Sequence, residues 1–195
     1  MTHDARFGEL RSLLQRSAST KTWDALCQHL DLWSYDTLEQ TALPYTLDIV
    51  TRWPDELERA APSRWVKALL EGQDAPQVAL VNALSLLSRE LSQPQLTALL
   101  TSPRLANLRR LDLEACWIAD AGFAALAASP YLSNLTSLNL SNNDLCHDGA
   151  AALAASPLLS HLTDLSIDYI GPEARAVLNA SPHLREPIRA QWRKP

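Results

Sequence analysis

Residues 108–118, LRRLDLEACWI, and residues 135–145, LTSLNLSNNDL, share one pattern of apolar positions. The step from Leu108 to Leu135 is 27 residues, and each leucine or isoleucine of the first stretch has a leucine at the same place in the second. A fixed step of this length indicates stacked copies of one structural unit, because a single unit cannot bury its apolar side alone. The sequence therefore predicts a solenoid.

Each unit is predicted to contain a short strand and then a helix. Leu111 and Leu113 alternate with Asp112, so a strand would place both leucines on the core side and the aspartate on the other. The stretch FAALAASP at residues 123–130 returns as AAALAASP at residues 150–157. Alanine favours a helix and lets neighbouring helices approach closely, whereas the Ser-Pro pair ends the helix.

Polar residues at the turns have expected structural roles. Asn143 and Cys116 occupy the same column of the repeat, where the amide or thiol can satisfy backbone groups as the chain leaves the strand. We therefore interpret Cys116 as structural rather than reactive. Asp120 and Asp148 stand where side-chain caps of the helix N-termini are expected.

Two further copies depart from the pattern at the ends of the array. The first copy begins near Val81 and carries Arg89 in place of the Asn/Cys residue. The last copy begins at Leu162 and is two residues shorter, with the loss near residues 168–170. Atypical outer copies are expected in a finite solenoid, because each end must present a polar side to water. The prediction is about four strand-helix units of 25–27 residues.

Residues 81–186 resemble leucine-rich repeats of the ribonuclease-inhibitor type, and the pieces GFAALAA at residues 122–128 and GAAALAA at residues 149–155 are loosely similar to bacterial GALA-type repeats. The resemblance implies an α/β fold, a short solenoid with a parallel sheet on its concave side. It also implies that this concave side binds another protein.

The N-terminal part shows no repeat and is predicted to be an all-α cap. Helices are expected over residues 4–17, 20–32, 34–53 with an interruption at Pro44, and 63–71. Four tryptophans lie here and form either an aromatic binding platform or, as we favour, part of a small core: Trp23, Trp33, Trp53 and Trp65. The predicted organisation is a helical capping domain over residues 1–74, the repeats over residues 75–186 and a tail over residues 187–195.

Stacking of the strands in register would bring the outward side chains together in rows. The first row would hold Ala83, Ser85 and Leu87. The other rows form the predicted protein-binding site on the concave side: Arg110, Asp112, Glu114, Ser137, Asn139, Ser141, Asp164, Ser166 and Asp168.

Composition and motifs argue against several other functions. A net charge of −5 gives no general basic footprint for nucleic acid, and no apolar run suits a signal peptide or membrane span. Phosphate-binding and hydrolase glycine motifs are absent, and neither histidines nor cysteines have metal-ligand spacing. The run Cys146-His147-Asp148 is interpreted as a corner loop. We expect no catalytic residue, no metal and no cofactor.

The resulting hypothesis is a non-catalytic, cytoplasmic protein-binding or scaffold module that is monomeric. Two alternatives remain open. Residues 43–50, LPYTLDIV, resemble the opening of an F-box although the downstream spacing departs from that motif, which suggests a ubiquitin-ligase substrate adaptor binding a Skp-like protein through residues 34–71. An enzyme of another type would need a pocket with convergent polar groups, expected near residues 65–90.

Overall fold

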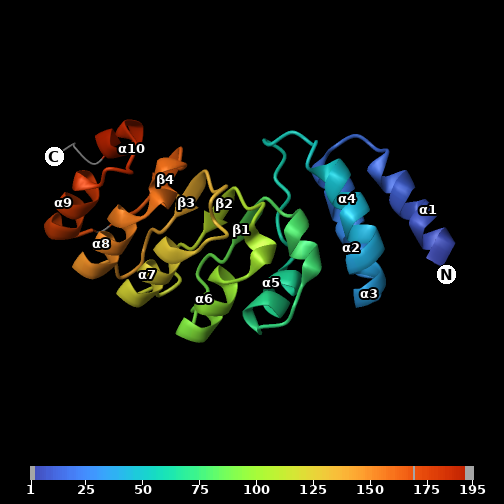
Figure 1. Ribbon diagram of the computed structural model, residues 1–195, viewed down its shortest axis with the longest axis horizontal. Helices are drawn as coiled ribbons and strands as arrows, with labels where there is room; N and C mark the ends of the chain where they lie inside the picture. The colour runs from blue at the N-terminus through green and yellow to red at the C-terminus, as the bar shows by residue number, and fades with distance from the viewer. Residues whose placement is uncertain (1–2, 169, 192–195) are drawn as a thin grey trace.

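Four strands of three residues each form one parallel sheet in the order β1-β2-β3-β4 (Figure 1). The computed structural model describes residues 3–168 and 170–191. The strands are β1 (Ala83–Ser85), β2 (Arg110–Asp112), β3 (Ser137–Asn139) and β4 (Asp164–Ser166). Order in the sheet follows order in the chain, as a solenoid requires.

The 27-residue register is confirmed. Leu84 pairs with Leu111, Leu111 with Leu138, and Leu138 with Leu165 along the sheet. All four are buried, and so are the leucines two residues further along in the first three units. The apolar column of the sequence is thus a continuous core, and the prediction of a short α/β solenoid is correct.

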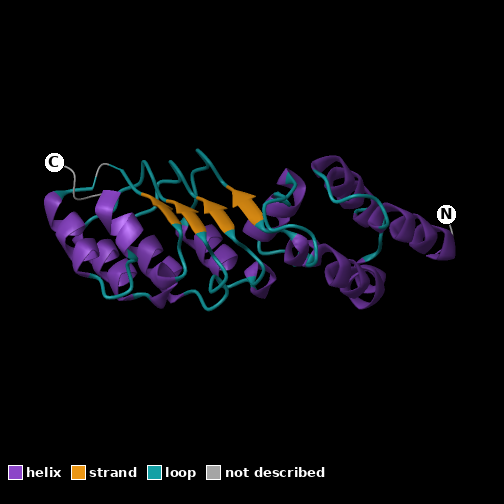
Figure 2. Ribbon diagram, turned by 90° about the horizontal axis from the view of Figure 1, so that it is seen from above, coloured by secondary structure: helices purple, strands orange, loops and turns teal. Residues whose placement is uncertain are grey.

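Helices cover one side of the sheet and leave the other side open (Figure 2). Neighbouring helices pack against one another along the array. They are α6 (Gln93–Leu100), α7 (Asp120–Ala128), α8 (His147–Ala155) and α9 (Pro172–Ala180). Short helical turns begin at the proline after two of them, η3 (Pro103–Leu105) after α6 and η4 (Pro157–Ser160) after α8, and a bend follows α9.

The serines before Pro130, Pro157 and Pro182 each tie their unit to the preceding one. The hydroxyls of Ser129, Ser156 and Ser181 donate to the carbonyl oxygens of Leu100, Ala127 and Ala154 at 2.7, 2.7 and 2.6 Å. These carbonyls stand at or near the ends of helices, where no intrahelical donor remains. The serine thus supplies a repeated bond between units as well as a helix stop.

Asn143 satisfies the turn that follows β3, as expected. Its Oδ1 accepts from the amides of Cys116 and Ile118 at 3.1 and 3.0 Å, and its Nδ2 donates to the carbonyls of Leu113 and Leu140 at 2.8 and 3.0 Å. The Cys116 thiol donates to the carbonyl of Leu86 at 3.1 Å, in a fully buried position. Burial raises the pKa of this thiol, which agrees with a structural role.

The expected aspartate caps are wrong. The N-caps of α7 and α8 are Ala119 and Cys146, neither of which caps with its side chain, while Asp120 and Asp148 lie within the first turns. Asp120 has a different partner, because its Oδ1 accepts from the backbone N–H of Cys146 at 3.0 Å. It therefore bonds the next unit instead of its own helix end.

The N-terminal helices form a separate end of the elongated molecule (Figure 1). Three are close to prediction, but the expected helix at residues 34–53 ends at Val50 and contains a π-helical segment just before Pro44. A π turn inserts one residue into the helical repeat, so the predicted interruption falls slightly upstream of the proline. The elements are α1 (His3–Leu14), α2 (Thr20–Leu30), α3 (Tyr35–Thr37), η1 (Leu38–Ala42), α4 (Leu43–Val50), α5 (Ser63–Leu70) and η2 (Pro76–Leu80).

The tryptophans of this part belong to the core, as favoured from the sequence. Trp23, Trp33, Trp53 and Trp65 are all buried. The rings of Trp23 and Trp65 meet edge to face at 6.2 Å, and the indole N–H of Trp23 donates to the carbonyl of Ala60 at 2.9 Å. The aromatic side chains thus anchor the linker, the segment at residues 51–62 between α4 and α5.

That linker covers the outer edge of the sheet. Ala60 forms a parallel bridge with Ala83, and the Ala61 amide donates to the Ala83 carbonyl at 3.1 Å. Helix α5 also packs against α6, so stacking begins before the predicted boundary at residue 74. The boundary itself remains a prediction. An edge strand covered in this way offers fewer free backbone groups to other chains.

The C-terminal end continues past α9 into α10 (Glu186–Gln191). Ile188 is buried against the last unit, inside the segment that the sequence assigns to a tail, whereas residues 192–195 lie outside the described residues. No helix among the described residues has the length and apolar character needed to cross a membrane.

Candidate binding surface

The open side of the sheet, which corresponds to the predicted concave side and keeps that name below, brings the predicted site residues together in rows. The 27-residue register aligns Arg110 with Ser137 and Asp164, and Asp112 with Asn139 and Ser166. Arg110 and Asp164 are exposed, and the other seven predicted residues are half-buried. Asn139 is therefore less exposed than its position in the strand suggests.

Hydrogen bonds across the strands fix many of these side chains. Ser85 donates to Asp112 at 3.0 Å, and Ser137 donates to Asp164 at 3.0 Å. The Asn139 amide donates to the Glu114 carboxylate at 2.9 Å. A surface that is already ordered loses little side-chain entropy when a partner binds.

Asp112 and Asn139 also hold the backbone. The amide of Glu114 donates to Asp112 Oδ1, and the amide of Ser141 donates to Asn139 Oδ1, each at 3.1 Å. Both acceptors thus stabilise the exit from their strand. The sequence did not indicate this second role, because it depends on side-chain direction at the turn.

A second turn carries the remaining acidic residues. The amide of Asn142 donates to Asp168 Oδ1 at 2.6 Å, and the Asn142 side chain donates to Glu114 at 3.3 Å. Glu114 therefore contacts two side chains of the next unit, and Asp168 contacts the backbone of the unit before it.

The first predicted row is only partly correct. Ser85 and Leu87 are exposed, but Ala83 is 6% exposed, because the linker at Ala60 and Ala61 lies over it. The sequence does not show which segment covers the first strand.

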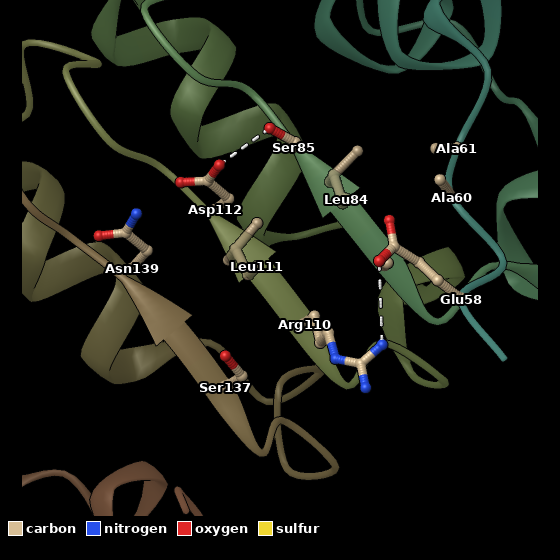
Figure 3. A pocket seen from close by; sticks show the side chains of 11 residues that line it. Glu58, Ala60, Ala61, Leu84, Ser85, Arg110, Leu111, Asp112, Ser137 and Asn139 are labelled. Atoms are coloured by element: carbon tan, nitrogen blue, oxygen red, sulfur yellow. Dashed lines mark hydrogen bonds and ion pairs between the residues drawn. The ribbon is translucent and has the colours of Figure 1, made fainter. Parts of the chain in front are cut away.

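The linker and strands β1 to β3 line an open depression of about 290 Å³ (Figure 3). Glu58 of the linker faces Arg110 of β2 across it, with 4.0 Å between the carboxylate and the guanidinium. Asp112, Ser137 and Asn139 line its opposite side. The pocket expected near residues 65–90 thus lies between the linker and the first three strands. Its ionisable lining residues are Glu58, Asp112 and Arg110.

Two exposed apolar side chains lie in the loops that follow β1 and β2, and only the first of them, Leu87, belongs to a predicted row. Leu87 is 54% exposed and Trp117 is 72% exposed. Trp117 has φ of +59°, a left-handed conformation that is unfavourable for a bulky residue. The sequence did indicate that Trp117 is exposed, because the equivalent residues one unit before and one unit after it are the acids Glu90 and Asp144.

Backbone bonds place the turn that carries Trp117 between the turns that carry those two acids. The Leu91 amide donates to the Cys116 carbonyl at 3.3 Å, and the Asp144 amide donates to the Ile118 carbonyl at 3.1 Å. Glu90 and Asp144 are both exposed. An exposed indole ring is chemically suited to a cationic group.

The run at residues 146–148 lies at the start of α8, and all three side chains are exposed. Among the described residues, no three histidine, cysteine or acidic side chains are grouped as a metal site would require. The segment resembling an F-box forms α4, in which Leu43, Thr46 and Val50 are buried.

Comparison with known families supplies the decisive observation. Residues 104–127 and 131–154 each match the family model described as leucine rich repeat. The chain contains leucine-rich repeats. The matched segments span β2 with α7 and β3 with α8, the two units whose sequences agree best. Leucine-rich repeat domains commonly mediate protein–protein interactions and are typically non-catalytic. Comparisons with curated proteins and with solved structures found no match to the chain.

Proposed function

We propose that the leucine-rich repeat array is a non-catalytic protein-binding or scaffold module that uses its concave side. The observation that carries the proposal is the interlocked polar surface on β2 to β4, whose hydrogen bonds run from unit to unit. Four carboxylates lie on it against one arginine, which itself faces Glu58: Asp112, Glu114, Asp164 and Asp168. A partner with a basic segment would complement this charge.

Trp117 extends the proposed surface onto the loop that follows β2. Tryptophan is enriched among the residues that contribute most to binding energy. The exposed indole shares its column of the repeat with the exposed acids Glu90 and Asp144, so a lysine or arginine of the partner could find a ring face on one turn and carboxylates on the adjacent turns. Nothing in the packing of the repeat requires an exposed aromatic side chain in this column, because the neighbouring units use acids.

The test is affinity capture from extracts of the source cells with two matched variants. The concave variant, Asp112→Asn with Glu114→Gln, removes two charges from the concave side. It keeps one side-chain oxygen at residue 112 to accept from the amide of residue 114, and one at residue 114 to accept from the Asn139 side chain. Asp24→Asn with Glu173→Gln removes two exposed charges from helices α2 and α9. We expect a partner that the wild type and the helix variant retain and the concave variant loses. Equal retention by all three proteins would exclude the concave side.

Once a partner is isolated, Trp117→Ala tests the contribution of this loop. We expect binding about 30-fold weaker, which corresponds to a loss of about 2 kcal/mol for a hot-spot tryptophan. Leu32→Ala, which truncates another exposed apolar residue far along the chain, should leave the affinity unchanged. Unaltered binding by the Trp117 variant would restrict the interface to the strands.

A further inference from the structure

Arg59 is a buried cation in the linker between α4 and α5. Its side chain is 5% exposed, whereas Glu58 and Ala60 on either side line the concave depression. Its Nε donates to the Leu80 carbonyl at 3.0 Å, and its backbone amide donates to Asn82 at 2.7 Å. Its Nη1 is buried and has no hydrogen-bond partner.

A second cavity, distinct from the concave depression, is lined by this arginine. Its volume is about 80 Å³. Thr51 and Asp55 line it from the N-terminal part, and Asn107 and Arg109 line it from the loop before β2. In volume it exceeds what one water molecule needs, so it has room for a small polyatomic group.

The charges around this cavity do not balance. Two guanidinium groups, those of Arg59 and Arg109, line it together with a single carboxylate, that of Asp55. Asp55 is engaged with Arg109, with 3.2 Å between Oδ1 and Nε, and among the described residues no carboxylate lies within ion-pair distance of Arg59. A buried charge that lacks a counter-charge is costly, so natural proteins pair such groups.

Burial also weakens the protonated state of this side chain. It lowers the pKa of the Arg59 guanidinium, the nearby Arg109 charge lowers it further, and Asp55 opposes both effects. A negative group in the cavity would offset the cost of burying the Arg59 charge and the repulsion between Arg59 and Arg109. Guanidinium groups bind oxyanions especially well, because their N–H groups match the spacing of carboxylate or phosphate oxygens.

We propose that the cavity binds a small oxyanion between the guanidinium groups of Arg59 and Arg109. The ligand is a free phosphate ion or a carboxylate group, two sources of the same chemistry. Because its lining comes from α4, the linker, η2 and the loop before β2, a bound anion would join the helical part to the repeats. This proposal is independent of what the concave side binds.

Thermal melts of the full chain test the site. Sodium phosphate and sodium acetate are titrated separately at constant ionic strength, with sodium chloride as the ion that exerts screening alone. Ligands that bind only the folded state raise the melting temperature in a saturable manner. We expect such a rise with at least one of the two oxyanions, and the effective one identifies phosphate or carboxylate as the source.

The matched variants are Arg109→Gln and Arg52→Gln. Both residues are partly exposed arginines in ion pairs with an aspartate, but only Arg109 lines the cavity. Arg109→Gln should weaken the anion effect about tenfold or more, since a hydrogen bond to a charged group contributes about 1.5–3 kcal/mol. Arg52→Gln should leave it unchanged. Arg59→Lys, if it folds, should behave like Arg109→Gln.

Three results would overturn the proposal. The first is the absence of a saturable rise with either oxyanion. The second is a rise that chloride reproduces at equal ionic strength. The third is an anion effect that Arg109→Gln retains in full, or that Arg52→Gln loses to the same extent.

Discussion

Gly149, in the first turn of α8, illustrates how closely adjacent units approach. A Cβ at this position would lie 2.5 Å from Asp120 Oδ1 and 2.9 Å from Leu145 Cδ1. The Asp120 oxygen is the acceptor for the Cys146 amide and cannot move without loss of that bond. Only a residue without a side chain fits between the two helices.

We therefore expect Gly149→Ala to destabilise the protein by about 1–3 kcal/mol, the usual cost of overpacking. Gly8→Ala is the control, because Gly8 lies in α1 and a Cβ there meets nothing within 4 Å. Alanine in an open helical position stabilises by about 0.5–1 kcal/mol. Urea denaturation of both variants checks this prediction, and shifts of the same sign would refute it.

Leu138 and Asn139 provide a test of the strand orientation. Leu138 is fully buried, so Leu138→Ala should cost about 2–5 kcal/mol through the lost contacts and the cavity left behind. Asn139→Ala removes bonds to Glu114 and Ser141 at a half-buried position and should cost about 0.5–1.5 kcal/mol. Equal shifts in chemical denaturation would contradict the orientation.

Single residues differ in how well the sequence predicts them. Leu138 follows from alternation and the 27-residue step, since burial of one face leaves no other register. The roles of Asp120 and Arg59 do not follow, because each depends on contacts with a segment whose position the local pattern does not specify. A charged residue in a linker gives no sign that it will be buried.

At the scale of the element, the turn after β3 depends on one side chain. Asn143 bonds the amides of Cys116 and Ile118 and the carbonyls of Leu113 and Leu140. Asn143→Ala should therefore cost about 2–5 kcal/mol, because each buried polar group left unpaired costs about 1–3 kcal/mol.

Asn134→Ala is the matched control for the Asn143 variant. Asn134 is exposed and makes one bond, from Nδ2 to the Ala106 carbonyl at 2.8 Å. Its loss should cost at most about 1 kcal/mol. Guanidinium denaturation of the two variants measures the difference, and comparable costs would show that the turn does not depend on Asn143.

The elements themselves are largely predictable where they repeat. The strand, turn and helix of each inner unit follow from leucine alternation, the Asn/Cys column and the Ser-Pro stop. Predictability is lower at the two ends of the array. The bridge at Ala60, the π segment η1 and the helix α10 lie where the period is absent, and there tertiary contacts decide the conformation.

At the scale of the whole molecule, one charged cluster joins the helical part to the repeats. Arg104 of η3 bonds Glu39 of η1 at 2.5 Å and Asp74 at 2.8 Å, and Tyr35 donates to Asp74 at 2.5 Å. The arginine lowers the pKa of both carboxyls. Tyr35, bonded to Asp74 and close to Glu39, has its pKa raised to about 12 and stays neutral.

This cluster predicts acid sensitivity. A carboxyl whose pKa is lower in the folded state stabilises the fold above its ordinary pKa, here 4.5 for glutamate and 3.8 for aspartate, and the stabilisation is lost as the pH falls further. Arg104→Gln should therefore be less stable at neutral pH but lose less stability on acidification. Urea melts across this pH range, with Arg52→Gln as control, measure the difference. Parallel pH profiles for wild type and Arg104→Gln would refute the prediction.

The cap itself should be indispensable. Residues 75–195 alone would expose the edge of β1 that Ala60 and Ala61 cover, together with the apolar side of the first unit. We expect this fragment to aggregate or to melt without cooperativity, while the full chain unfolds in one transition. Calorimetry and light scattering provide the measurement. A monomeric fragment with the melting temperature of the full chain would refute the role of the cap.

The serine bonds between units determine how such a chain can change its length. Ser129, Ser156 and Ser181 each bond a carbonyl at or near the end of the preceding helix, so this one bond recurs at the same place at three successive joins. A tandem copy of residues 120–146 placed after residue 146 would keep this serine bond at both of its joins. The linker, by contrast, fits only β1. Evolution by internal duplication can therefore lengthen this arc from its middle, in whole units, while its N-terminal end stays closed to growth.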